Sequence, residues 1–162
     1  MKKFIALFAL MVITLASYAQ VYKMYNTRNY HNQLRLNTMT GEVQQIQDDG
    51  QSWIVCSARE ISGDKESRFR LYETQNMWTF ILLDSYNGRL WQVQYSTQDL
   101  DNLFCIPINK DELGSDNEKC IFSIQPLTSM YQYYLINDRT GDMWKFQWST
   151  KGDDYRWIEK FK

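Results

Sequence analysis

An alternation of apolar and polar residues with a period of two runs through most of the chain. Phe69 to Tyr72 alternates in this way, and Leu90 to Tyr95 sets glutamines against Trp91 and Val93. Trp78 to Asp84 is a β-branched and aromatic run, and Leu103 to Ile108 could form a further strand. Such segments are typical of strands with one or both faces buried. No apolar period of 3.6 residues is sustained, so we expect helices to be nearly absent.

The turn between two of these segments has a clear chemical signature. Asp84-Ser85-Tyr86-Asn87-Gly88 follows the apolar run and precedes Leu90. An Asp side chain can accept a hydrogen bond from the backbone two residues on, and glycine adopts the left-handed conformation that closes a short loop. This stretch therefore predicts a β-hairpin.

The hairpin pattern occurs three times without a gap, aligned on Gly41, Gly88 and Gly141. We number positions from these glycines. The shared positions, in repeat order, are −19 (Tyr22, Phe69, Phe122), −17 (Met24, Leu71, Ile124), −7 (Leu34, Ile81, Tyr134), −5 (Leu36, Leu83, Ile136), +5 (Ile46, Val93, Phe146) and +6 (Gln47, Gln94, Gln147). Single repeats of this size cannot bury their apolar faces alone and must pack on their neighbours.

The repeats predict an all-β protein of three antiparallel meanders, spanning roughly residues 22–56, 69–108 and 122–161 within one domain, 20–162. The hairpin Leu82-Leu83-Asp84-Ser85-Tyr86-Asn87-Gly88-Arg89-Leu90-Trp91 resembles those of β-propeller blades. This resemblance covers ten to fifteen residues per repeat, and three repeats are fewer than the four or more blades of known propellers. It implies a closed, pseudo-threefold assembly of blade-like sheets; the alternative is a β-trefoil.

The N-terminus has the pattern of a secretory signal peptide. Lys2 and Lys3 precede an apolar run from Phe4 to Ala16, and Ser17-Tyr18-Ala19 places small side chains before a cleavage site. A membrane-spanning helix needs about 20 apolar residues, more than this run offers. We therefore expect residues 1–19 to be removed and the mature chain to start at Gln20, in the periplasm or outside the cell.

Charge and cysteine content narrow the classes of function. Without Lys2 and Lys3 the chain has 16 basic and 19 acidic side chains, which argues against a nucleic-acid partner. Export permits disulfides, and the three cysteines leave at least one thiol unpaired. Cys105 and Cys120 flank a polar loop, so a disulfide between them is a candidate that the sequence leaves open. We interpret Cys56 as a buried apolar residue.

Residues with catalytic potential are few. His31 is the only histidine and occupies position −10, where the other repeats have Trp78 and Tyr131, so we interpret it as a packing residue. The sequence contains no zinc-ligand cluster, phosphate loop or Gly-x-Ser-x-Gly motif. We expect no cofactor and no metal.

Acidic residues recur after the third strand of every repeat, each set followed by an aromatic residue. These candidate binding residues are Asp48, Asp49 and Trp53, then Asp99 and Asp101, then Asp153, Asp154 and Trp157. Equivalent loops of a repeat protein project from one end, so the carboxylates would attract a cationic partner and the aromatics would anchor it. Solvated turns are the simpler interpretation of the same pairs.

These observations favour a non-catalytic exported protein that binds another protein with a basic surface, most concretely a periplasmic inhibitor or immunity protein acting on a toxin or enzyme. The alternative is a carbohydrate-binding module that stacks sugars on Trp78, Tyr131 and Trp148. A glycan-cleaving enzyme using two of the loop carboxylates is a third, weaker hypothesis.

Overall fold

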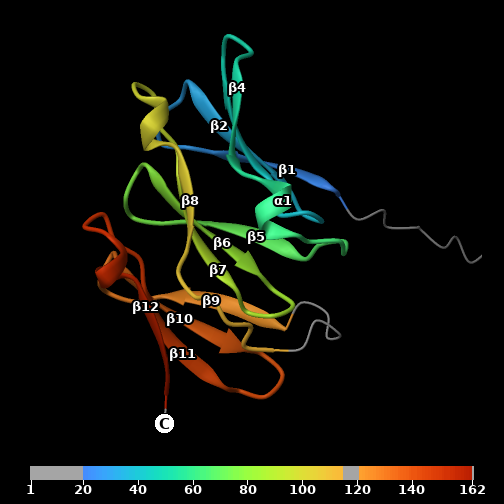
Figure 1. Ribbon diagram of the computed structural model, residues 1–162, viewed down its shortest axis with the longest axis vertical. Coiled ribbons are helices and arrows are strands. Elements are labelled where there is room, and N and C mark those ends of the chain that lie inside the picture. Colours follow the sequence, from blue (N-terminus) through green and yellow to red (C-terminus); the bar gives the residue numbers. More distant parts are fainter. Residues whose placement is uncertain (1–19, 115–120, 162) are drawn as a thin grey trace, which may run out of the picture.

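Three four-stranded antiparallel sheets, one per repeat, make up the protein (Figure 1). The computed structural model describes residues 20–114 and 121–161. The strands are β1 (Tyr22–Asn26), β2 (Asn32–Asn37), β3 (Val43–Gln47) and β4 (Ser52–Cys56) in the first sheet; β5 (Phe69–Glu73), β6 (Thr79–Asp84), β7 (Leu90–Gln94) and β8 (Phe104–Pro107) in the second; and β9 (Phe122–Pro126), β10 (Gln132–Asn137), β11 (Met143–Gln147) and β12 (Trp157–Lys160) in the third. Each sheet is a meander in chain order. The prediction of an all-β repeat protein is confirmed.

In the parts of the chain that the structure describes, helical structure is limited to single turns. The described residues contain the helix α1 (Ala58–Ile61) and two 3-10 turns, η1 (Leu100–Asn102) and η2 (Asp153–Tyr155). Ser57 begins α1 by accepting a hydrogen bond from the Arg59 N–H. Because α1 and both 3-10 turns lie in the connections, they shape the loops and leave the sheets uninterrupted.

The central hairpin of every sheet closes by the mechanism that the sequence predicts. Gly41, Gly88 and Gly141 have φ values of +78°, +77° and +76°, in the left-handed region that side chains disfavour. Four residues before each glycine, the side chain of Asn37, Asp84 or Asn137 accepts a hydrogen bond from the backbone two residues on. The repeats are therefore equivalent in backbone conformation as well as in sequence.

The sheets stack in a row, and two separate cores lie between them. In β6, Phe80 and Leu82 join the core shared with the first sheet, whereas Ile81 and Leu83 join the core shared with the third. The second sheet is therefore buried on both faces, and each outer sheet has one face without a neighbouring sheet among residues 20–114 and 121–161. Neither the expected closed assembly nor a trefoil barrel is found in this part of the chain. The apolar positions predicted which faces of each sheet are buried. The sequence alone did not show which face of one sheet packs on which face of another.

Repeat positions determine which way each side chain points in this stack. Positions −7 and −5 face the following sheet, as Leu34 and Leu36 do in the first core and Ile81 and Leu83 in the second. Positions −19, −17 and +5 face the preceding sheet. We call these the following face and the preceding face of a sheet.

Polar contacts between neighbouring sheets also repeat. The N–H at position −19 of one sheet donates to the carbonyl at −3 of the sheet before it, from Phe69 to Thr38 at 2.9 Å and from Phe122 to Ser85 at 3.0 Å. The glutamine at +4 bonds the backbone at +8 of the next sheet. Gln45 Nε2 donates to the Ser96 carbonyl at 2.7 Å, and Gln92 Oε1 accepts from the Ser149 N–H at 3.2 Å. The two junctions therefore use hydrogen bonds at equivalent repeat positions.

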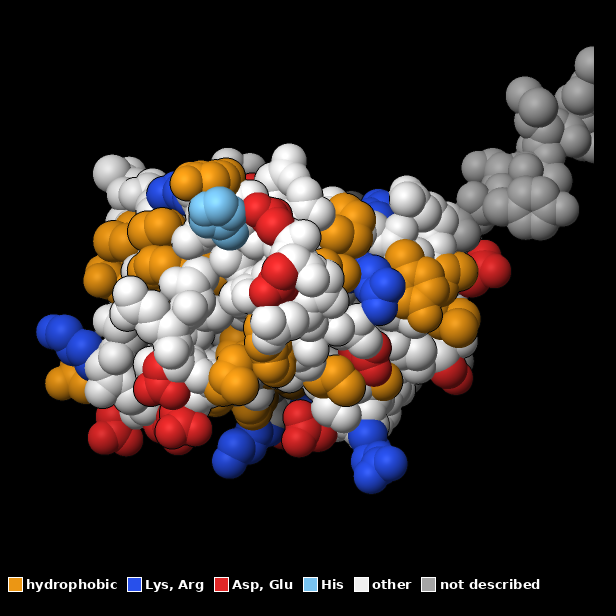
Figure 2. All heavy atoms as spheres, turned by 90° about the horizontal axis from the view of Figure 1, so that it is seen from above, with side chains coloured by type: hydrophobic (Ala, Val, Ile, Leu, Met, Phe, Trp, Pro, Cys, Tyr) orange, Lys and Arg blue, Asp and Glu red, His pale blue; other side chains and the backbone are white. Residues whose placement is uncertain are grey.

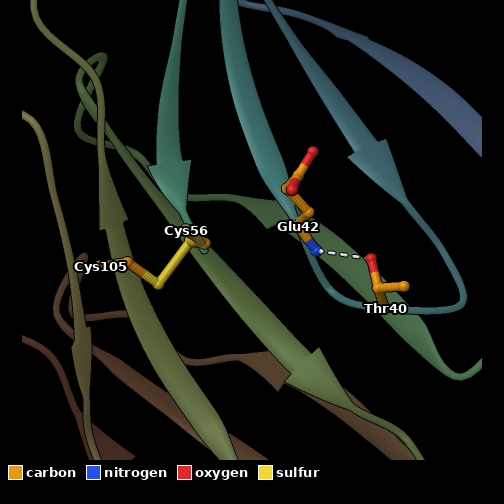
Figure 3. The surroundings of a disulfide bond; sticks show 4 residues. All are labelled: Thr40, Glu42, Cys56 and Cys105. Carbon is orange, nitrogen blue, oxygen red and sulfur yellow. Dashed lines mark hydrogen bonds between the residues drawn. A yellow bond between two sulfur atoms is a disulfide. The ribbon is translucent and has the colours of Figure 1, made fainter. Parts of the chain in front are cut away.

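A disulfide between Cys56 and Cys105 crosses the first junction, joining the ends of β4 and β8 (Figure 3). Their Cα atoms are 5.1 Å apart, within the range that disulfides span. The candidate pairing of Cys105 with Cys120 is therefore wrong, because Cys105 is bonded elsewhere; Cys120 lies outside the described residues. Cys56 is buried, as expected, but its sulfur is bonded. Spacing along the chain suggested that the two cysteines flanking one loop are neighbours, whereas sheet stacking brings together cysteines of the first and second repeats.

Candidate functional site

One edge of the stack gathers the connections opposite the glycine hairpins (Figure 1). Each sheet contributes the loop after its third strand, residues 48–51, 95–103 and 148–156, and the turn after its first strand, residues 27–31, 74–78 and 127–131. Because the repeats are equivalent, these six segments lie along the same side of the molecule. We call this surface the loop edge.

The predicted acidic residues all lie on the loop edge and are exposed. Two of them stabilise their own loops through hydrogen bonds. Asp49 accepts hydrogen bonds from the Gln51 N–H at 3.0 Å and from its side-chain amide at 2.8 Å. Asp99 begins η1 by accepting from the Asp101 N–H at 2.9 Å. These two carboxylates therefore have a structural role in addition to their charge.

Two further carboxylates have basic side chains as partners. His31 Nδ1 lies 2.7 Å from Asp48 Oδ2, and both side chains are about 60% exposed. Asp153 forms an ion pair with Arg156, whose side chain is almost fully buried beside it. Burial lowers the pKa of Arg156 from its ordinary value. The other two predicted carboxylates, Asp101 and Asp154, are exposed, and the structure shows neither a loop hydrogen bond nor an ion pair for their side chains. They are therefore accessible to a ligand.

Hollows line the loop edge at equivalent positions in the three repeats. Each contains the residue at −10 and the glutamine at +6: His31 with Gln47, Trp78 with Gln94, and Tyr131 with Gln147. Thr97 of the second sheet lines the hollow that also contains Asp48 and Asp49. Another hollow joins the second and third sheets between Asn102 and Asp153. The three loops thus border one another rather than standing apart.

The candidate stacking residues differ in how far their rings are accessible. Trp78 is half-buried with its ring centroid 5.3 Å from that of Tyr95, and Tyr131 is 37% exposed. Trp148 is fully buried, lies against Tyr131 and donates from Nε1 to the Met130 carbonyl. Trp148 therefore has no ring face open to a sugar and is removed from the candidate set, because its position in the repeat points it into the second core.

Trp53 and Trp157 are both half-buried, on the strands that follow the acidic loops. Trp53 pairs with Gln45 in the register of β3 and β4. Trp157 pairs with Gln147 in the register of β11 and β12, and Lys145 Nζ lies 5.8 Å from the centroid of its ring. They lie next to the loops rather than at their tips.

The most exposed apolar residues of the loop edge were not predicted. Tyr30 is 81% exposed, Leu100 54% and Tyr155 50%, and each belongs to a different repeat. They are hard to find from the sequence, because they are not at equivalent repeat positions and because Leu100 and Tyr155 lie in the 3-10 turns η1 and η2. Figure 2, which views the stack from above, shows the pale-blue histidine beside one hydrophobic and one acidic side chain, with other acidic side chains in separate groups.

Searches for similar proteins found no matching family model, no matching curated protein and no matching solved structure. In the described parts of the chain, no group of three or more His, Cys, Asp or Glu side chains is placed to hold a metal ion. None of the described helices has the length and apolar character needed to cross a membrane.

Proposed function

We propose that this chain is a non-catalytic binding protein that engages another protein through its loop edge. The observation that carries the proposal is one exposed apolar side chain per repeat: Tyr30, Leu100 and Tyr155. Leu100 and Tyr155 adjoin exposed carboxylates in the sequence, and Tyr30 lies against His31, whose ring contacts Asp48. Aromatic anchors within a polar rim are typical of protein interfaces. Carboxylates at the rim mainly accelerate capture of a basic partner.

In its most concrete form, the proposal is an exported inhibitor or immunity protein that covers a toxin or enzyme in the periplasm or outside the cell. The signal-peptide pattern of residues 1–19 and the excess of acidic over basic side chains support this setting. We also propose that each sheet is equivalent to a propeller blade, which would make the loop edge the equivalent of a propeller's loop face.

The test is capture of a partner from the culture of the native host by the immobilised chain 20–162. Asp48, Asp101 and Asp154, one from each repeat, are changed to Asn, which leaves the caps of Asp49 and Asp99 intact. We expect the variant to capture the partner more slowly, with the largest difference at low ionic strength. Tyr30→Ala and Tyr155→Ala should instead shorten the lifetime of the complex.

The matched control changes three exposed carboxylates at the opposite edge, Asp64, Asp111 and Asp138, to Asn. This control has the same net charge as the test variant and should bind like the unmodified chain. If both variants slow capture equally, the effect comes from the net charge and not from the loop edge. If neither variant changes binding, the loop edge is not the binding site.

A second candidate function is carbohydrate binding. It is favoured by the placement of Trp78 and Tyr131 in equivalent hollows, each ring supported by a buried aromatic and accompanied by a glutamine. Oligosaccharide titrations followed by tryptophan fluorescence test it. A spectral shift that disappears in Trp78→Ala but persists in the triple Asn variant would put this function ahead of the first.

A further inference from the structure

The outer face of the third sheet retains the character of a packing face. Positions −7 and −5 are Tyr134 and Ile136 here, where the first two sheets bury Leu34, Leu36, Ile81 and Leu83 against the following sheet. Position +2 is Met143, equivalent to the buried Val43 and Leu90. Tyr134, Ile136 and Met143 are only partly covered in this structure. This following face is therefore apolar but has no sheet beyond it among the described residues.

The glycine hairpin of the third sheet is also uncovered. A Cβ added at Gly41 would meet Phe69, and one added at Gly88 would meet Phe122, the aromatic at −19 of the next sheet. A Cβ added at Gly141 would have no heavy atom of the described residues within 4 Å. The Asp138 carbonyl occupies position −3, where Thr38 and Ser85 accept the N–H of that aromatic residue. At the third hairpin, the described residues therefore provide no aromatic side chain against the glycine and no N–H donor from a following sheet.

The outer face of the first sheet is its preceding face, the kind of face that packs on a following face in the internal junctions. Position −19 is Tyr22 and position −17 is Met24, and both are 51% exposed. Ile46 is at +5, where Val93 and Phe146 are buried against the preceding sheet. Arg35 replaces the leucine that the other repeats have at −6, and it lies 5.4 Å from the Tyr22 ring centroid. This preceding face keeps three apolar positions but is more polar at its centre.

Charge complementarity appears at the position where the internal junctions use a polar contact. Gln45 and Gln92 at +4 bond the backbone of Ser96 and Ser149 at +8 of the next sheet. The third sheet has Lys145 at +4, on its outer face, and the first sheet has Asp49 at +8. If a first sheet followed the third in the same register, the Lys145 ammonium group would lie beside the backbone of Asp49, a residue that carries a carboxylate. One chain therefore supplies both members of the pair.

We propose that a second copy of this chain docks head to tail, its first sheet on the outer face of the third sheet, in the register of the internal junctions. Tyr22 of the second copy then covers the Gly141 hairpin and its N–H donates to the Asp138 carbonyl, while Lys145 pairs with Asp49. Head-to-tail contacts close into rings when the rotation permits. Two copies would place six sheets in one ring, within the four to eight blades of propellers. The polar centre around Arg35 makes this junction weaker than the two within the chain, so the association depends on concentration.

Charge reversal tests the register directly, with molar mass measured by light scattering or sedimentation equilibrium over a range of concentrations. The chain 20–162 should reach the mass of two copies as concentration rises. Lys145→Glu and Asp49→Lys should each weaken this association by at least tenfold. The double variant, which restores an opposite-charge pair, should recover most of the loss. Asp101→Lys and Lys110→Glu, which are exposed but outside the register, are the matched controls and should leave the association unchanged.

Substitutions on the apolar faces distinguish this docking from a symmetrical one. Ile136→Asp and Met24→Asp should each give monomers, and a mixture of the two should form pairs through the one junction whose faces are both intact. Thermal unfolding of each variant checks that it folds. A folded chain that stays monomeric at high concentration would overturn the proposal. So would an association abolished by Ile136→Asp but unchanged by Met24→Asp, because that pattern belongs to two third sheets facing each other.

Discussion

The three hairpin glycines share a backbone conformation but differ in what surrounds them. Alanine in the left-handed region costs about 1–2 kcal/mol at any of them. At Gly41 the new methyl group would also overlap Ile61 and press on Phe69, and at Gly88 it would press on Phe122. At Gly141 it would meet no heavy atom of residues 20–114 or 121–161 within 4 Å.

We therefore predict a graded loss in the free energy of unfolding: Gly41→Ala largest, Gly88→Ala next and Gly141→Ala smallest, with overpacking adding about 1–3 kcal/mol at the first site. Urea denaturation of the monomeric chain measures it. Equal losses at all three sites would contradict this gradient, because they would mean either that the left-handed conformation alone matters or that the third hairpin is covered like the others.

Asp84 differs from its repeat equivalents because it is both a turn residue and a buried anion. Its carboxylate accepts from Arg68 Nε at 2.9 Å and lies 2.7 Å from Nη2, and both side chains are nearly fully buried. Asn37 and Asn137 close the same turn without an ion pair.

Asp84→Ala would leave the Arg68 charge buried without the Asp84 carboxylate, and breaking a buried ion pair in this way costs about 3–5 kcal/mol. Asn137→Ala loses only turn hydrogen bonds, at about 1 kcal/mol each. We predict this difference between the two variants in chemical denaturation. Similar losses for Asp84→Ala and Asn137→Ala would show that the ion pair contributes little to stability.

Between elements, the Cys56–Cys105 disulfide ties the first sheet to the second across 49 residues of chain. Cross-linking a loop of that length stabilises the folded state by about 4 kcal/mol in the chain-entropy model. The variant with both cysteines changed to Ala should lose most of this, and the first sheet should become the first region to exchange its amide hydrogens. Peptide mapping of the unreduced chain checks the pairing itself, and a Cys105–Cys120 peptide would contradict it.

At the scale of elements, local signals predicted the strands and hairpins because alternation and turn chemistry act over a few residues. The partners of each sheet face could not be read in this way. Leu82 and Leu83 are equally apolar in the sequence, yet they belong to different cores. The disulfide and the burial of Trp148 follow from the same stacking. The acidic loops were found from sequence because they repeat, whereas Tyr30 and Leu100 were missed because they do not.

For the whole molecule, the loop edge and the outer sheet faces are separate surfaces, and we propose a separate partner for each. The loop edge carries exposed apolar side chains with carboxylates around them, which suits a partner of different chemistry. The outer faces match the internal junctions, which suits a second copy of the chain. Asp49 lies where the two surfaces meet, so variants of Asp48, Asp101 and Asp154 are the ones that test partner binding alone.

Export is a prediction at this scale as well. The Lys-Lys start, the apolar run and the small residues before Gln20 predict that protein from its native host begins at or near Gln20. N-terminal sequencing of secreted or periplasmic protein measures this. Recovery of chains that retain Met1 from the cytoplasm would contradict both the export and an oxidising setting for the disulfide.

The central claim is that each repeat is one sheet and that the three sheets stack in a row, which places the loops on one edge and leaves two outer faces. Native hydrogen exchange of the chain 20–162, at a concentration where it is monomeric, tests this most directly. Amides of β6 and β7, in the sheet that is buried on both faces, should exchange far more slowly than those of β2, β3, β10 and β11. Equal protection of the central strands in all three sheets would contradict the stack, because it would mean that no sheet has an open face.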